Sequence, residues 1–256
     1  MELKPDNYDA FWRNGWTVVE RVFTNDETDH ICDLATRLCD EDLAAAKENA
    51  YLADRAEDGT QQSRKMAQPF LRHEAFRRFA TDARLRGLIE QFIGAPPRMV
   101  ADQIFMKPPR FGSAKPYHQD NAYFLLYPDD EAITAWIALD DVDASNGCLR
   151  YIEGSHRGPI LKHLHDPDEP HNRSPAQDDI DLSREVLACV GKGGVVFHHC
   201  KTLHTSHRNE SDRWRRGYAT HWASAAVKSE NDTISNAYFN RHAELYDETV
   251  GAAGNG

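Results

Sequence analysis

His118 and Asp120 stand two residues apart in the stretch KPYHQDNAYF, residues 115–124. In a β-strand, side chains at positions i and i+2 face the same side, so this pair would place an imidazole nitrogen beside a carboxylate oxygen. Two histidines and one carboxylate form the ligand set of non-haem Fe(II) oxygenases, which leaves three coordination positions open. The pair alone is a short motif that also arises by chance on protein surfaces. It therefore predicts an iron site only if another part of the chain supplies a second histidine.

Candidates for that second histidine are concentrated in one short stretch. The four histidines there are His198, His199, His204 and His207. A buried histidine is more often a hydrogen-bonded core residue than a metal ligand, so three of the four are expected to have ordinary roles. His199 could instead orient a ligand from behind, although a solvated or packed histidine is the favoured interpretation.

Several motifs occur in the same order as in a known family. They are MKPP at residues 106–109, HQD at 118–120, TAWIALDDVDASNGCLRYIEGSH at 134–156 and LHTSHRNESDRWRRGY at 203–218. With these motifs the sequence resembles the phytanoyl-CoA dioxygenase family of Fe(II)- and 2-oxoglutarate-dependent oxygenases. The resemblance covers roughly residues 8–25 and 98–225. The segment between these ranges resembles the family only in being helical, and residues 161–183 hardly match at all.

The resemblance implies a role for each motif residue. Iron would be held by His118, Asp120 and His204, which are also the implied catalytic residues. Among the clustered histidines, only His204 has both a serine at +2 and an arginine at +11. Arg215, at +11, would bind the distal carboxylate of 2-oxoglutarate, and Ser206, at +2, could add a hydrogen bond to it. An arginine suits this task because its guanidinium is always charged and offers a fixed pair of donors.

Neighbouring arginines compete for the same role. Arg213 and Arg216 flank Arg215, and a run of charges is usually a solvated face. In a strand, Arg213 and Arg215 would share one face while Arg216 would point to the other. The family spacing favours Arg215 over both.

Other positions have weaker support. Trp136 and Gln103 fall where the family contacts 2-oxoglutarate. Trp136 could equally be a core tryptophan, and family members often carry methionine at the position of Gln103. Asn121, Tyr123 and Phe124 directly follow the HQD motif and could either line a substrate cavity or pack in the core.

The implied reaction uses O2 and converts 2-oxoglutarate to succinate and CO2, and ascorbate is expected to help activity in vitro. Related halogenases lack the carboxylate ligand, so the presence of Asp120 favours hydroxylation. Epoxidation, desaturation or cyclisation with the same cofactors remain alternatives, as does a non-catalytic barrel that binds a ligand. The expected substrate is a small organic molecule. A CoA thioester is disfavoured, because it carries several negative charges and this chain is acidic.

Composition limits the partners and the compartment. The 256 residues include 41 acidic and 30 basic side chains, a formal net charge of −11, which disfavours nucleic acids and anionic membrane surfaces. No apolar run approaches the ~18 residues of a membrane span, and the N-terminal residues do not form a signal peptide. Five widely spaced cysteines without a CxxC motif predict reduced thiols and a cytoplasmic protein. We expect a monomer or a homodimer.

The predicted secondary structure changes from helices to strands near residue 98. Before it, apolar spacing predicts a helix starting at Thr24, where Glu27 completes a capping box, and a second helix over about residues 74–92. Residues 50–66 are polar and predict a loop. After it, strand-like runs are expected at 98–106, 116–125, 132–140, 148–152, 185–190, 194–200 and 215–223. The long segment 161–183 predicts a functional lid or disorder.

A run of helices followed by a run of strands predicts a mainly β architecture with packed helices. The resemblance narrows this expectation to a double-stranded β-helix, the cupin-like jelly roll. We expect one domain over residues 1–256. In it, residues 1–97 would give mainly helical support, 98–225 the β-helix core and 226–256 a C-terminal extension.

Overall fold

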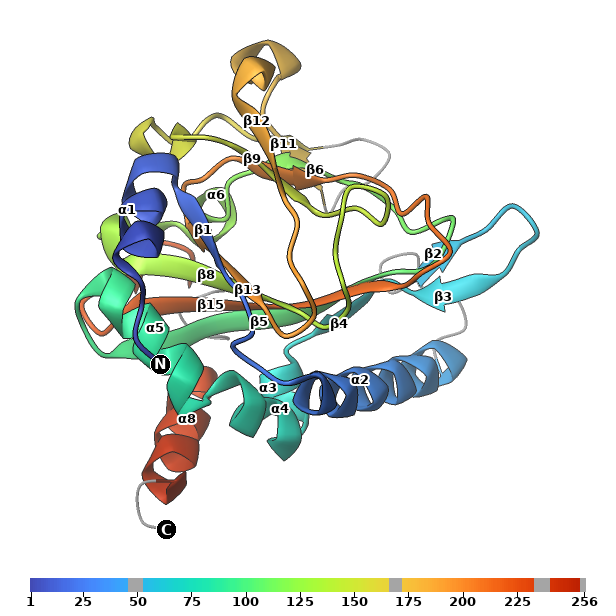
Figure 1. Cartoon of the computed structure of the whole chain (residues 1–256), viewed down its shortest axis with the longest axis horizontal. Helices are drawn as coiled ribbons and strands as arrows, with labels where there is room; N and C mark the ends of the chain where they lie inside the picture. The colour runs from blue at the N-terminus through green and yellow to red at the C-terminus, as the bar shows by residue number, and fades with distance from the viewer. Residues whose placement is uncertain (46–52, 166–171, 233–239, 254–256) are drawn as a thin grey trace.

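Two antiparallel sheets form the centre of the molecule in the computed structural model, which describes residues 1–45, 53–165, 172–232 and 240–253. The larger sheet has the strand order β1 (Trp16–Val19), β13 (Val195–His199), β8 (Ala132–Ala138), β15 (Arg215–Ser224), β5 (Pro97–Lys107) and β4 (Lys65–Ala67). The smaller sheet has the order β12 (Glu185–Ala188), β9 (Leu149–Ile152), β14 (His204–Ser206) and β6 (Lys115–His118). Figure 1 shows the smaller sheet lying across from the larger one.

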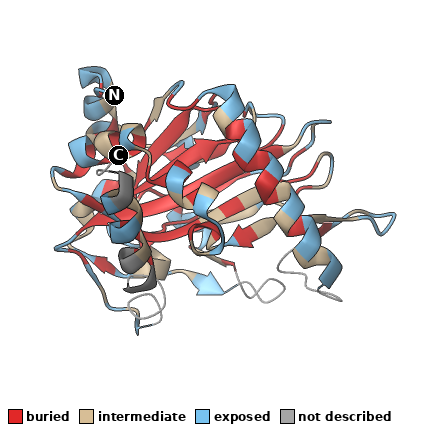
Figure 2. Ribbon diagram, turned by 90° about the horizontal axis from the view of Figure 1, so that it is seen from below, coloured by how far each residue is buried: buried red, intermediate tan, exposed pale blue. Residues whose placement is uncertain are grey.

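Helices cover the face of the larger sheet that points away from the smaller sheet (Figure 1). They are α2 (Asn25–Ala45), α3 (Pro69–Arg72), α4 (Glu74–Ala80), α5 (Ala83–Ile93) and α8 (Asn240–Ala253), whereas α1 (Pro5–Asn14) lies beside the edge strand β1. Figure 2 shows the buried residues concentrated in the strands and the exposed ones on the outer sides of the helices. The smaller elements are β2 (Ala53–Arg55), β3 (Gln61–Ser63), α6 (Asn121–Phe124), β7 (Leu126–Tyr127), β10 (Leu164–His165), β11 (Arg173–Ser174) and β16 (Lys228–Ser229).

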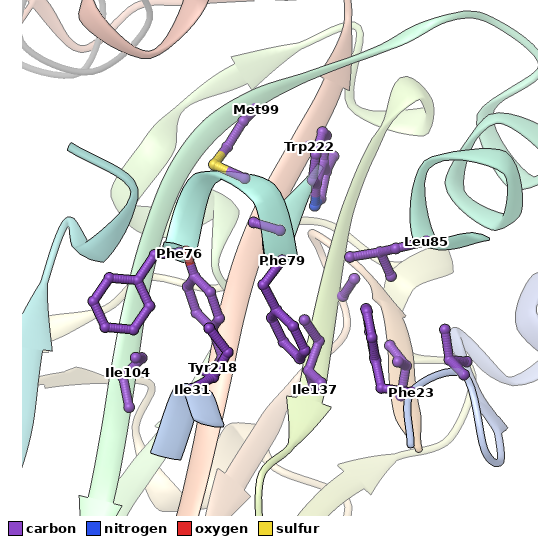
Figure 3. Packing of buried hydrophobic residues seen from close by; sticks show 14 of the residues in the cluster. Phe23, Ile31, Phe76, Phe79, Leu85, Met99, Ile104, Ile137, Tyr218 and Trp222 are labelled. Atoms are coloured by element: carbon purple, nitrogen blue, oxygen red, sulfur yellow. The ribbon is translucent and has the colours of Figure 1, made fainter. Parts of the chain in front are cut away.

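Alternate side chains of the central strands point to opposite faces of the larger sheet, one towards the helices and the other towards the smaller sheet. On β8, Ile133 and Ile137 face the helices and belong to the main apolar core, whereas Trp136 points to the space between the sheets. Figure 3 shows Phe76 and Phe79 of α4 packed on Tyr218 of β15. The helical layer therefore seals one face of the larger sheet, and the other face is left to form a cavity with the smaller sheet.

The expected fold class is confirmed: the chain is mainly β with packed helices and has the two facing sheets of a double-stranded β-helix. None of the helices in the described residues has the length and apolar character needed to cross a membrane.

Two local predictions were wrong. The helix expected over residues 74–92 is interrupted, because the carboxylate of Asp82 accepts a hydrogen bond from the backbone N–H of Arg84 and begins α5 as a new helix. The loop expected over residues 50–66 contains three short strands from residue 53 onward, whereas residues 50–52 lie outside the described residues. These strands form through pairing, since β4 adds to the edge of β5 and β2 pairs with β3.

The long segment 161–183 has no long element. Within the described residues it contains the two-residue strands β10 and β11 and two short 3-10 turns. Residues 166–171 lie outside the described part of the chain, so the lid expected there stays a prediction.

The predicted capping box at the start of α2 is confirmed, and it yields a stability prediction. The Glu27 carboxylate accepts hydrogen bonds from Thr24 N (2.8 Å) and from Arg84 Nη2 on α5 (2.6 Å). The bond from Arg84 is the leading cause that lowers the pKa of Glu27 to about 2. A pKa lowered by folding means that this carboxylate stabilises the protein above its usual value of 4.5 and stops doing so as the pH falls towards about 2.

We therefore expect Glu27→Gln to lower the free energy of unfolding at pH 7 by about 1 kcal/mol. The difference in free energy of unfolding between wild type and Glu27→Gln should shrink as the pH falls through the acid range. Urea unfolding at a series of pH values measures this. Glu41→Gln is the control, because Glu41 makes one exposed ion pair with Arg37 at 3.4 Å. A deficit that stays constant with pH would contradict the assignment.

Candidate metal centre and adjoining cavity

His118, Asp120 and His204 converge at the edge of the smaller sheet. His118 ends β6 and His204 begins β14, and the two residues are direct cross-strand partners. Asp120 does not continue the strand as expected. Its backbone is helical (φ −57°, ψ −38°) and leads into α6. The turn from strand to helix, and not strand alternation, therefore brings the carboxylate beside both imidazoles.

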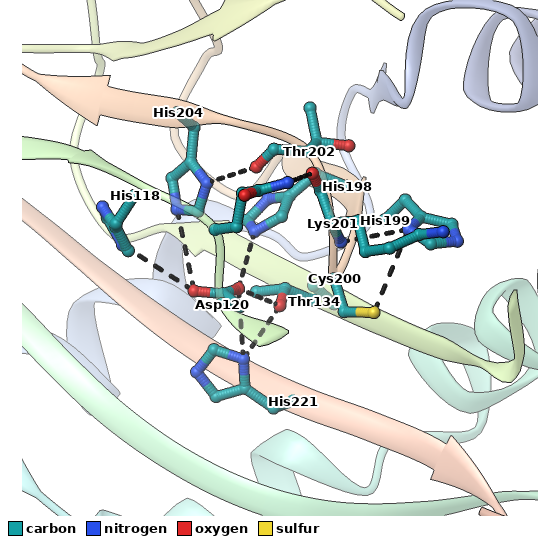
Figure 4. Close-up of polar contacts among 12 residues, drawn as sticks. His118, Asp120, Thr134, His198, His199, Cys200, Lys201, Thr202, His204 and His221 are labelled. Carbon is teal, nitrogen blue, oxygen red and sulfur yellow. Dashed lines mark hydrogen bonds and ion pairs between the residues drawn. The ribbon is translucent and has the colours of Figure 1, made fainter. Parts of the chain in front are cut away.

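The distances are those of a potential metal site. Nε2 of His118 lies 3.7 Å from Oδ1 of Asp120, and Nε2 of His204 lies 3.8 Å from the same oxygen. One donor atom from each of the three residues lies within 4.8 Å of the other two, and all three side chains are buried. Figure 4 shows both imidazoles directed at the carboxylate. The sequence prediction that these residues come together is thus matched by the geometry.

Hydrogen bonds fix the tautomer of both histidines. Nδ1 of His118 lies 2.9 Å from the carbonyl of Pro116, and Nδ1 of His204 lies 2.9 Å from the carbonyl of Thr202. A carbonyl can only accept, so both Nδ1 atoms carry a proton, and in the neutral form of each ring Nε2 keeps the lone pair. Burial lowers the pKa of His118 well below its usual value, which keeps this imidazole neutral. The donor set of two imidazoles and one carboxylate suits a divalent iron ion.

The two oxygens of Asp120 have different surroundings. Oδ1 faces the two histidines, whereas Oδ2 accepts hydrogen bonds from Thr134 Oγ1 (2.7 Å) and from His198 Nε2 (3.0 Å). Burial alone would raise the pKa of Asp120, but the surrounding imidazoles, His204 foremost, lower the pKa well below its usual value. Asp120 is therefore ionised, with Oδ1 available as a metal ligand.

A cavity of about 450 Å³ adjoins this cluster, between the two sheets. Alternate residues of β15 line it, with Arg215 towards one end of the strand and His221 towards the other. Between them Gly217 carries no side chain, and a Cβ there would overlap the ring of Trp136. Gly217 thus leaves room for Trp136 to lie beside Arg215.

Arg215 is a buried cation with unused donors. Its side chain is 2% exposed, and its Nε and Nη2 have no hydrogen-bond partner in the part of the chain that the structure describes. The guanidinium lies over the ring of Trp136, 4.6 Å from the centroid. Burial lowers the pKa of Arg215 to about 10, so the group stays charged at neutral pH. Burying an unpaired charge is costly, and a bound anion would supply the missing partner.

The two competing arginines are engaged elsewhere. Arg213 precedes β15 and forms an exposed ion pair with Asp143 at 2.5 Å. The expectation that it shares a strand face with Arg215 was therefore wrong, because the strand begins only at Arg215. Arg216 does point to the opposite face, where it pairs with Asp140 at 2.8 Å.

The remaining predicted residues divide between the cavity and the fold. Ser206, Trp136 and Gln103 line the same cavity as Arg215. Tyr123 and Phe124 line it as well.

Asn121, the third of the residues that follow the motif, has a structural role. Its side chain bonds the backbone N and O of Leu126 and so holds the turn after α6. His199 is packed, with its Nε2 3.3 Å from Asp130, as the favoured reading had it.

Three residues at the site were missed from the sequence: Thr134, His198 and His221. His198 had been grouped with the histidines of ordinary role, yet it bonds the carboxylate of Asp120. His221 stands six residues after Arg215, so strand alternation places both on the cavity face. That even spacing was the available signal. Nε2 of His221 is buried and has no hydrogen-bond partner among the described residues.

Comparisons with known proteins agree with this geometry. A sequence model described as "Phytanoyl-CoA dioxygenase (PhyH)" matches residues 11–217. Peroxisomal phytanoyl-CoA dioxygenase of Bos taurus is 31% identical over 168 residues, which are 62% of this chain and 49% of the relative. The match therefore spans about half the length of that protein. A probable alpha-ketoglutarate-dependent hypophosphite dioxygenase of Stutzerimonas stutzeri is 27% identical, over 80% of this chain and 74% of the relative.

Solved structures share the fold. The non-heme alpha ketoglutarate dependent carbocyclase SnoK from nogalamycin biosynthesis superimposes with a TM-score of 0.69 at 26% identity, covering 89% of this chain and 87% of its own. The epimerase SnoN, solved with Fe3+, alpha ketoglutarate and nogalamycin RO, gives a TM-score of 0.68 at 24% identity, covering 88% of this chain and 85% of its own.

Proposed function

Because the chain belongs to the phytanoyl-CoA dioxygenase family, we propose that it is a non-haem iron dioxygenase that uses 2-oxoglutarate to hydroxylate a small organic molecule. The observation that carries the proposal is that one cavity brings together two sets of ligand-binding groups. One set is His118, Asp120 and His204, and the other is the guanidinium of Arg215, whose Nε and Nη2 have no hydrogen-bond partner among the described residues.

In this proposal the Nε2 atoms of His118 and His204 and Oδ1 of Asp120 hold Fe(II). Bound iron together with 2-oxoglutarate would activate O2, with conversion of 2-oxoglutarate to succinate and CO2 and oxidation of the substrate. The residues of this chain bind and orient the reactants and exclude water from the cavity. The Nδ1 bonds of both histidines to backbone carbonyls direct each Nε2 towards the metal position and support the assignment.

The distal carboxylate of 2-oxoglutarate would bind Arg215. Its Nε and Nη2 offer two parallel N–H donors, the arrangement that pairs best with a carboxylate. Trp136 holds the guanidinium from one side, and Ser206, which lines the same cavity, would add a hydroxyl donor. Gln103 on β5 would complete the wall, since it pairs with Ala219 of β15.

The substrate would occupy the part of the cavity lined by Tyr123, Phe124 and His221. The single hydroxyl proton of Thr134 goes to Asp120, so Nδ1 of His221 must donate to Thr134, at 2.8 Å. Nε2 of His221 is then a buried acceptor, without a partner among the described residues, on a ring that lines the cavity. A substrate with a hydroxyl or amine proton would satisfy it.

Hydroxylation is preferred because Asp120 is placed to occupy the third ligand position. Cyclisation is the second candidate, because SnoK is a carbocyclase of the same fold. We also propose a cytoplasmic protein that acts as a monomer or homodimer without nucleic acid. The five cysteines, all free thiols, are consistent with a reducing compartment.

The test is succinate release by the purified protein with Fe(II), 2-oxoglutarate, O2 and ascorbate, across a panel of small organic compounds. We expect at least one compound to raise succinate release above the level without substrate, and omission of iron to abolish it. A product heavier by one oxygen indicates hydroxylation, whereas loss of two hydrogens indicates desaturation or ring closure. Absence of iron-dependent turnover of 2-oxoglutarate, with or without added compounds, would contradict the proposal.

A further inference from the structure

A row of three polar side chains crosses the larger sheet behind Asp120. His198 on β13 and His221 on β15 are both direct cross-strand partners of Thr134 on β8. All three side chains are buried and line the cavity. Outside this row, β8 is entirely apolar and β13 begins with three apolar residues, so polar side chains at this one level call for an explanation.

The direction of each hydrogen bond in the row can be worked out. Oδ2 of Asp120 only accepts, so Thr134 Oγ1 donates to it at 2.7 Å and His198 Nε2 donates to it at 3.0 Å. Thr134 has no second proton and therefore accepts from Nδ1 of His221. On the other side, Nδ1 of His198 accepts from the hydroxyl of Tyr151 at 2.8 Å. Thr134 and His198 thus donate directly to Asp120, and His221 donates to Thr134; Figure 4 shows these contacts around the carboxylate.

We propose that Thr134, His198 and His221 are positioning residues that fix the rotation of the Asp120 carboxylate. This inference rests on the proposed function. Two donors occupy Oδ2, so rotation about the Cβ–Cγ bond would break both hydrogen bonds inside a buried site. Oδ1 alone then faces Nε2 of His118 and of His204. The carboxylate would bind the metal through one oxygen and leave the remaining positions open to 2-oxoglutarate and O2.

His221 acts on Asp120 indirectly, through Thr134. Its Nδ1 is 3.6 Å from Oδ2, too long for a direct hydrogen bond, but its bond to Thr134 orients the Thr134 hydroxyl proton towards the carboxylate. The ring is held in place by Phe124, 4.7 Å away between centroids in an edge-to-face arrangement. Partners of this kind around a metal ligand typically change metal affinity by about 10- to 100-fold when they are removed.

The experiment is anaerobic calorimetric titration of the metal-free full-length protein with Co(II), together with the visible absorption spectrum of the Co(II) form. Thr134→Val removes the hydroxyl and keeps the shape, and we expect it to weaken Co(II) binding by about 10-fold or more and to alter the spectrum. Thr134→Ser keeps the hydroxyl donor, so its Co(II) affinity and its spectrum should both be those of the wild type. Thr28→Val is the matched control, because Thr28 is also buried but its hydroxyl bonds only the backbone carbonyls of Thr24 and Asn25.

His198→Phe is the second variant, in case Thr134→Val does not fold, and it should weaken binding by a similar factor. Equal Co(II) affinity and spectra for wild type and the folded Thr134→Val or His198→Phe proteins would overturn the inference while leaving the proposed function intact. Failure of the wild type to bind Co(II) would overturn the proposed function and, with it, this inference. A loss of affinity in Thr134→Val that Thr134→Ser does not restore would also count against the positioning role.

Discussion

Asp120→Ala is expected to abolish iron-dependent release of succinate and to reduce metal binding strongly. The substitution removes one of three ligands, and it also leaves the donors of Thr134 and His198 without their acceptor in a buried site. An unsatisfied buried polar group costs about 1–3 kcal/mol, so the variant should also be less stable. Measurement of succinate release and of Co(II) affinity on the same preparation checks both effects.

The matched control for this substitution is Asp130→Ala. Asp130 also contacts a buried histidine, since its carboxylate lies 3.3 Å from Nε2 of His199, but it does not line the cavity. Asp120→Asn keeps the shape of the side chain and separates loss of the charged ligand from loss of folding. Full activity in either Asp120 variant would refute the ligand assignment.

Arg215→Ala should raise the concentration of 2-oxoglutarate required for turnover. The lost contact would be two hydrogen bonds to a charged group, each worth about 1.5–3 kcal/mol, which corresponds to at least about a 100-fold weaker interaction. The KM for 2-oxoglutarate, measured by succinate release, checks this. Arg215→Lys keeps the charge but lacks the paired donors, so its KM for 2-oxoglutarate should lie between those of wild type and Arg215→Ala.

The same variant separates binding from stability. In the absence of 2-oxoglutarate Arg215 is a buried charge whose Nε and Nη2 have no partner in the described part of the chain, so its removal should not lower the free energy of unfolding. Arg213→Ala is the control, because that guanidinium is exposed and pairs with Asp143. An unchanged dependence on 2-oxoglutarate in Arg215→Ala would move the anion site to another residue.

The iron ligands and Arg215 were predicted from motifs shared with the family, whereas most of the strands that carry the site were predicted from local sequence. The expected strand boundaries agree with the structure to within one or two residues at most positions, but β14, which begins at His204, was not expected as a strand. The apolar spacing that predicted helices is also confirmed, since Phe76, Phe79 and Leu85 do pack in the main core (Figure 3). These features depend on local periodicity, which a single sequence carries.

Features that depend on pairing between distant strands could not be predicted in this way. The row of Thr134, His198 and His221 exists only because β13, β8 and β15 are adjacent and in one register. The short strands after residue 53 have polar sequences with little intrinsic β-propensity, and they form because a sheet edge or a partner hairpin strand is available. The helical turn at Asp120 was likewise hidden by the strand-like residues before it.

The central claim is that one cavity holds iron at His118, Asp120 and His204 and 2-oxoglutarate at Arg215. Anaerobic crystallography with Fe(II) and 2-oxoglutarate, using anomalous scattering at the iron edge, tests it most directly. The account predicts a single strong anomalous peak within coordination distance of both Nε2 atoms and of Oδ1, and density for 2-oxoglutarate that ends at the guanidinium of Arg215. An iron peak elsewhere, no peak at all, or 2-oxoglutarate that does not reach Arg215 would contradict it.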